Sequence, residues 1–119
     1  MNPAQMEARR WSALDVNSTV QDVVTENAYI THVMLVNNDN ATRYVQFFNQ
    51  ANGDVVLGTT DSQWIPVPAG PGGITLLDLP FGYSALGPAI SIAATTTPTG
   101  VVNVTNNMYA LVLYTLAKG

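Results

Sequence analysis

The residue types that most often bind metals or attack substrates are scarce in this sequence, which holds one histidine and no cysteine. His32 lies within an apolar run, where we expect an imidazole satisfied within a sheet rather than a catalytic one. A metal ion needs further ligands, and Asp39, Asn40 and Asp54 do not have the spacing of a calcium loop. The sequence therefore predicts no metal site and no cofactor.

One segment begins like the nucleophile elbow of serine hydrolases. In Gly82-Tyr83-Ser84-Ala85-Leu86, however, Leu86 stands where the second glycine belongs, and the setting between a strand and a helix is missing. The carboxylates lie mostly in loops or at strand ends, and no two are paired by strand spacing. We therefore predict a protein that is not an enzyme and has no catalytic residues.

Two short clusters have residue types that are typical of interfaces. Arg9, Arg10 and Trp11 form the denser one, which is either a solvated tail or a contact with a neighbouring subunit. Trp64 and Ile65 follow a polar loop. Trp64 could stack on a sugar, although a tryptophan in that place more often packs in a core or against a subunit. The candidate interface residues are therefore these five.

The elements that must position these residues are short apolar runs separated by glycine, proline and asparagine. The runs are too short for helices, and glycine or proline borders them. Their number and spacing predict an all-β protein, an antiparallel β-sandwich of about eight strands with a jelly roll as the favoured topology. Nine apolar runs are the candidates for these roughly eight expected strands: Val20–Val24, Tyr29–Val36, Arg43–Phe48, Val55–Leu57, Trp64–Val67, Ile74–Leu77, Ala89–Ile92, Val101–Val104 and Met108–Leu116.

Turn chemistry predicts how the early strands are joined. The four polar residues Asn37–Asn40 form a turn, so we expect Tyr29–Val36 and Arg43–Phe48 to be hairpin partners. Asn52-Gly53 is the strongest hairpin signal in the chain, and it leads to the expected strand Val55–Leu57.

Prolines mark the later elements. Pro66 within Trp64–Val67 indicates an edge strand, because proline cannot donate to a ladder. The segments Pro68–Gly73 and Pro80–Tyr83 contain proline and glycine, which favour tight reversals.

Two of the runs, Tyr29–Val36 and Met108–Leu116, are apolar on both faces. A strand of this kind is either central and covered on both sides or placed at a subunit contact.

The first 20 residues differ from the rest, since they show no alternation of apolar and polar residues. We expect an N-terminal arm over residues 1–20 and a β-sandwich domain over residues 21–119. Asn2 followed by Pro3 fits the start of a helix, so a short helix from Pro3 towards Leu14 is one expectation for the arm.

Composition narrows the classes of partner. Charged residues make up 10% of the 119 residues, against about 25% in an average protein, which suits a surface partly covered by neighbours. The net charge of −4 argues against nucleic acid and anionic membranes as partners. The chain shows no signal peptide and no apolar run near the roughly 20 residues that a membrane helix needs.

Four segments carry a resemblance to a known family: VVLGTT at Val55–Thr60, WIPVPAG at Trp64–Gly70, FGYS at Phe81–Ser84, and Leu113-Tyr114 in the last strand. The chain from about Tyr29 to Tyr114 resembles small β-sandwich structural proteins of tailed bacteriophage particles. The N-terminal arm lies outside the resemblance.

The resemblance implies a virion component made in the host cytoplasm. It implies a capsid decoration or cement protein on the capsid exterior, which forms a homotrimer, binds the major capsid protein and stabilises the shell. The alternative is a neck, tail, baseplate or fibre module that binds a partner protein, or a host-surface glycan through Trp64 or the loop Thr95–Gly100.

Overall fold

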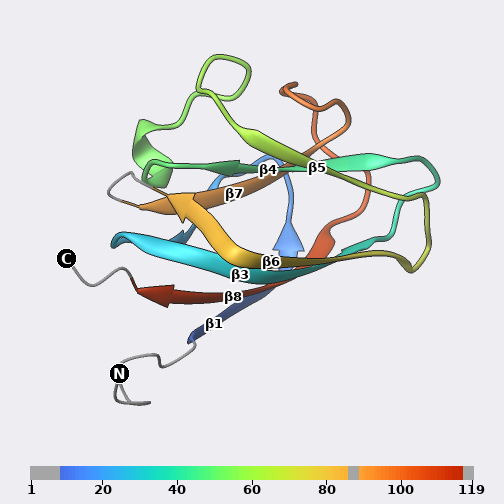
Figure 1. Cartoon of the computed structure of the whole chain (residues 1–119). Helices are drawn as coiled ribbons and strands as arrows, with labels where there is room; N and C mark the ends of the chain where they lie inside the picture. Colours follow the sequence, from blue (N-terminus) through green and yellow to red (C-terminus); the bar gives the residue numbers. More distant parts are fainter. Residues whose placement is uncertain (1–8, 86–88, 117–119) are drawn as a thin grey trace.

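Eight strands form two four-stranded antiparallel sheets, which lie as two layers in the computed structural model of the chain (Figure 1). The structure describes residues 9–85 and 89–116, with the backbone alone for residues 77–85. The strands are β1 (Arg9–Val16), β2 (Gln21–Val24), β3 (Ala28–Asn37), β4 (Arg43–Phe48), β5 (Gln63–Val67), β6 (Gly73–Ala85), β7 (Ile90–Thr95) and β8 (Met108–Leu116).

The strand order is that of a jelly roll. Sheet A has the order β1-β8-β3-β6, and sheet B has the order β2-β7-β4-β5. The chain therefore pairs β1 with β8, β2 with β7, β3 with β6 and β4 with β5, as if one long hairpin had been rolled up. The predicted fold class is confirmed, and so is the edge position of the strand that contains Pro66, since β5 ends sheet B.

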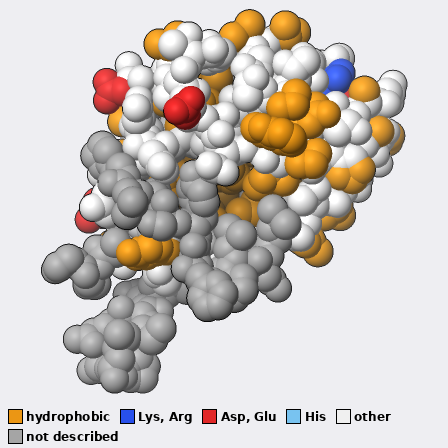
Figure 2. Space-filling view, turned by 45° about the horizontal axis from the view of Figure 1, so that its top comes forward, with side chains coloured by type: hydrophobic (Ala, Val, Ile, Leu, Met, Phe, Trp, Pro, Cys, Tyr) orange, Lys and Arg blue, Asp and Glu red, His pale blue; other side chains and the backbone are white. Residues whose placement is uncertain are grey.

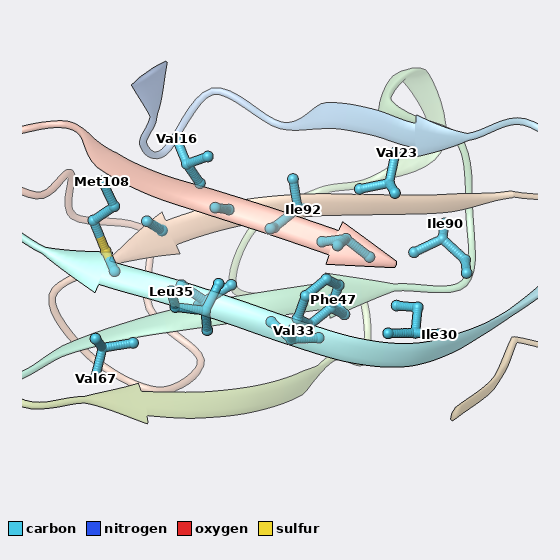
Figure 3. Close-up of a cluster of buried hydrophobic side chains, with 14 of the residues drawn as sticks. Val16, Val23, Ile30, Val33, Leu35, Phe47, Val67, Ile90, Ile92 and Met108 are labelled. Atoms are coloured by element: carbon cyan, nitrogen blue, oxygen red, sulfur yellow. The ribbon is translucent and has the colours of Figure 1, made fainter. Parts of the chain in front are cut away.

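The core lies between the sheets and is built from alternate residues of their strands (Figure 3). Val33 and Leu35 of β3, Phe47 of β4 and Ile90 and Ile92 of β7 point into it, and all are buried. The alternation places the intervening residues of each strand on the outer face of its sheet.

The predicted hairpin between the second and third expected strands is wrong, because β3 belongs to sheet A and β4 to sheet B. The turn after Asn37 crosses from one sheet to the other. The Asn37 amide donates to the carbonyls of Ala41, Val67 and Pro68 at 2.9 to 3.2 Å, which ties this corner to the end of β5. Turn-forming residues predict a reversal of the chain, but they do not determine which strand pairs next.

The expected hairpin at Asn52-Gly53 is also wrong. Asn52–Asp54 form a single 3₁₀ turn, and Val55–Leu57 lie in a loop. The Asn52 backbone N–H donates to the Asp22 carboxylate at 2.8 Å, and the Val56 N–H donates to the Thr60 hydroxyl at 2.9 Å. These side-chain bonds hold the backbone in loop conformations instead of a ladder.

The expected strand Val101–Val104 is likewise mostly loop, with one isolated bridge between Asn103 and Thr95.

Pro80–Tyr83 do not form the predicted reversal, because their backbone continues within β6. The ladder between β3 and β6 shifts register there. His32 lies opposite Asp78 and Ile30 opposite Tyr83, so residues 79–82 of β6 stand against Thr31 alone. Proline lacks the N–H that a regular ladder needs, which accounts for an interruption at this place.

The N-terminal prediction needs the largest correction. Arg9–Val16 form edge strand β1, which pairs with β8, so no helix reaches Leu14 and these residues of the expected arm belong to the sandwich. Trp11 and Ala13 pack against the core while Ser12 and Leu14 are exposed, a period-two pattern that the sequence interpretation missed. Residues 1–8 lie outside the described residues.

Candidate functional site

His32 lies on the outer face of sheet A, where it is exposed. On β8, Leu113 pairs with His32 and Tyr114 with Ile30, so Thr31 is an extra residue and forms a bulge in β3. The Thr31 hydroxyl donates to the Leu113 carbonyl at 3.2 Å and lies 3.1 Å from His32 Nδ1. The imidazole thus has a partner within the sheet, as expected, but it is not enclosed by apolar neighbours.

The described residues do not assemble a reaction centre around this histidine. Among the described side chains, those of residues 9–76 and 89–116, no group of three or more His, Asp or Glu is placed to hold a metal ion. Ser84, the serine of the elbow-like segment, lies in the ladder of β6 opposite Tyr29, and the next described element is strand β7. The backbone at Ser84 is therefore that of a paired strand and not that of a turn from a strand into a helix.

Asp39 is a buried carboxylate with a structural task. It accepts hydrogen bonds from Arg43 Nε at 2.7 Å and from the backbone N–H groups of Thr105 and Asn106 at 2.8 and 2.6 Å. Burial by itself raises the pKa of Asp39, but these hydrogen bonds and the charge of Arg43 outweigh it and hold the pKa below its usual value. The carboxylate joins the corner after β3 to the loop before β8.

The outer face of sheet B is covered by loops of the same chain. Gln46 points to this face, is buried, and donates to the Thr95 hydroxyl at 2.7 Å and to the Gly100 carbonyl at 3.2 Å. The Ser62 hydroxyl donates to the other side of the Gln46 amide at 3.0 Å. The loop between β4 and β5 and the loop after β7 therefore close over the sheet, and Phe48 beneath them is fully buried.

Figure 2 shows this loop-covered side brought forward. Hydrophobic and polar side chains are interspersed over most of the view, and hydrophobic ones gather in its right half.

No loop among the described residues covers the outer face of sheet A in this way. Two rows of directly opposed residues run across β6, β3 and β8, and both rows are apolar. One row is Ile74, Val36 and Tyr109, and the other is Leu76, Met34 and Leu111. Ile74 and Leu76 of β6 are 53% and 70% exposed, and the other members are partly exposed. We call the following residues the open face: Met34 and Val36 of β3, Ile74 and Leu76 of β6, and Tyr109, Leu111 and Leu113 of β8.

Strand β1 borders the open face with more polar residues. Arg10 lies opposite Leu113, and Ser12 lies opposite Leu111. Both are exposed, and so is Leu14 further along the strand. The apolar centre of the face therefore has a polar rim on the β1 side.

The five residues predicted for an interface lie on edge strands of different sheets. Arg9 and Arg10 are exposed on β1, whereas Trp11 on the same strand is partly buried against the core. On β5, Trp64 is 46% exposed and Ile65 packs against the core. Because β1 packs over β7 while β5 packs over β6 and β3, the two clusters lie at opposite edges.

Trp64 packs against an aromatic neighbour on β4. Its ring meets that of Tyr44 edge to face, with centroids 5.8 Å apart and planes at 78°. Pro66 follows on the same face of β5 and is exposed. Trp64 and Pro66 thus form a small exposed patch on the edge strand of sheet B.

The sequence interpretation missed the open face as a site, although its signal was present. The runs Tyr29–Val36 and Met108–Leu116 are apolar on both faces, and the structure covers only the inner face of each. A contact with another subunit, the other prediction for strands of this kind, therefore stays a prediction.

No protein-family model matches this sequence, and no curated protein is significantly similar to it. Within the part of the chain that is described, no helix is long and apolar enough to cross a membrane. The fold and the open face therefore carry the functional argument.

Proposed function

We propose that this protein is a non-enzymatic structural component of a phage particle, a capsid decoration or cement protein that oligomerises and stabilises the shell. The observation that carries the proposal is the open face. A contiguous apolar surface on a small domain is costly in water unless another surface covers it, and such surfaces mark sites of association. The low content of charged residues supports the same view.

The capsid role rests on the resemblance between Val55–Thr60, Trp64–Gly70 and the phage structural proteins, and on the jelly roll, which is common among capsid proteins. A decoration protein works by many weak contacts that act together. Copies that bridge neighbouring capsomers add their binding energies by multivalency, and the shell then resists internal pressure better.

The test is binding of the purified chain to expanded empty shells of the phage whose genome encodes it. We expect the protein to sediment with the shells and to raise the temperature at which they break. Leu76→Asp on the open face should lower shell binding, because assembly buries this face. Val102→Asp is the matched control, since Val102 is 61% exposed on a loop of the other side. A wild-type chain that ignores the shells would refute the proposal.

A second candidate is a module that recognises host-surface glycans. The exposed ring of Trp64, held edge to face by Tyr44, is of the kind that stacks on sugars. Glycan-array signals that disappear in Trp64→Ala and persist in Val102→Ala would favour it, whereas an array without signals would count against it.

A further inference from the structure

The outer face of sheet A, with the open face as its apolar centre, has the size of a protein–protein contact. Four strands about 4.8 Å apart and nine residues at about 3.4 Å each, the length of β8, give this whole outer face a flat footprint of about 590 Å². A stable interface buries about 800 Å² of accessible surface on each partner, and the accessible surface of a face with projecting side chains exceeds its flat footprint. One partner of similar dimensions can therefore cover the whole face.

The chemistry of the face selects an apolar partner. Among the described residues that β3 and β8 present to it, there is no Asp, Glu, Lys or Arg. Arg10 on β1 and His32 and Asp78 in the row of Leu113 lie beside the two apolar rows and not within them. The best cover is a second apolar surface with the same twist, and twisted sheets pack on one another face to face about 10 Å apart.

We propose that the open face of one copy packs against the open face of a second copy of this chain, about a two-fold axis. This deepens the assembly role proposed above, because it names the partner of the open face. With the axis along the strands between β8 and β3, Leu111 of one copy lies over Met34 of the second copy, and Leu76 meets the β1 side.

This arrangement gives the contact the usual anatomy of an interface. The apolar residues of β3 and β8 form its centre, and Ser12 and Arg10 lie at its rim, where they stay in contact with water. A two-fold pair also buries a flat face completely, whereas subunits around a three-fold axis meet through two different patches. We therefore infer a dimer at this face in place of the trimer that the phage resemblance implies.

The first experiment is analytical ultracentrifugation of the full chain over a range of concentrations. We expect one species with twice the mass of the chain. Its dissociation constant should stay unchanged or fall as salt is raised, since the contact is apolar and the two copies carry like net charge. A monomer or a trimer at all concentrations would overturn the proposal.

Matched variants locate the contact. Leu111→Asp should raise the dissociation constant at least about 100-fold, because the two-fold axis places the change at the apolar centre of the contact twice. Val102→Asp, exposed on the other side of the molecule, should leave the dissociation constant unchanged. Equal effects of the two variants would overturn the proposal, and circular dichroism of each variant shows that it is folded.

Cross-linking tests the geometry of the contact. Because the sequence has no native cysteine, an introduced cysteine is the only thiol that can react. Leu111→Cys, near the proposed axis, should be joined into a covalent dimer by a short bis-maleimide, and Val102→Cys should not. Shell binding by a chain that is monomeric in these assays would overturn this inference and leave the decoration role standing. A dimer that does not bind shells would support this inference and overturn the decoration role.

Discussion

In both sheets every second residue of a strand points to the outer face, but these outward residues differ between the two sheets in polarity and in burial. Beneath the loops of sheet B, the outward residues include Gln46, Ser91 and Thr95, which are buried and hydrogen-bonded. On sheet A, outward residues such as Met34 and Leu111 are apolar and only partly buried. The outer face of sheet B thus includes polar groups that are bonded to the loops above them, whereas no described loop covers Met34 and Leu111.

Loop length explains the difference. The connections that fold over sheet B are long, spanning residues 49–62 between β4 and β5 and residues 96–107 between β7 and β8. The connections next to β1 and β3, residues 17–20 and 25–27, are too short to reach across a sheet. The described loops therefore cover the outer face of sheet B and do not reach over that of sheet A.

The largest expected effect is a loss of stability in a variant beneath the loops, which a variant on the open face should not share. Phe48→Ala beneath the loops should lower the free energy of unfolding by about 3–5 kcal/mol, because it leaves a cavity in a fully buried site. Leu76→Ala on the open face should change it by less than about 0.5 kcal/mol in the dissociated protein. Chemical denaturation at low protein concentration measures both. Similar losses for the two variants would break the distinction between the faces.

The corner that joins the sheets should show the next largest effect. Asp39→Ala should cost about 2–3 kcal/mol, because Arg43 and two backbone N–H groups lose their acceptor.

The effect of this corner should also depend on pH. Since the pKa of Asp39 is lowered in the fold, its contribution is fully present above the unfolded pKa of about 3.9 and is lost as pH falls through the folded pKa. Stability measured from pH 6 down to pH 2 should therefore fall less steeply in Asp39→Asn than in the wild type. Parallel curves would show that this carboxyl does not contribute.

The smallest effect tests the polar network under the loops. Gln46→Ala should cost about 1–2 kcal/mol, because Thr95, Ser62 and the Gly100 carbonyl lose a buried partner. Hydrogen exchange should then rise in the loop after β7 and stay unchanged in β3. Met34→Ala on the open face is the control and should leave exchange in these loops unchanged.

The fold class could be predicted from the sequence because strand-length apolar runs and turn residues are local signals. The pairing of β3 could not, since Asn37–Asn40 specify a reversal while the long-range bonds of Asn37 to Val67 and Pro68 decide which sheet follows. Strand β1 was missed because its alternation is weak, with Trp11 and Ala13 as its main inward residues.

Part of the open face could be predicted from the sequence. The doubly apolar runs in β3 and β8 indicated that a second surface had to be covered, but whether loops or another molecule cover it depends on where the long connections fold. Trp64 was correctly expected to be near an edge, and Ile65 beside it turns inward because neighbours in a strand face opposite ways.

Strand β1 lies beside β8 throughout its length, so Arg9 stands opposite Tyr114 although 104 positions separate them in the chain. A short peptide could join the molecule into a ring, and the ring could be cut at Glu26, in an exposed connection, without separating any paired strands. A circular permutant of this kind should keep both layers intact, since the pairing of the strands does not depend on where the polypeptide starts.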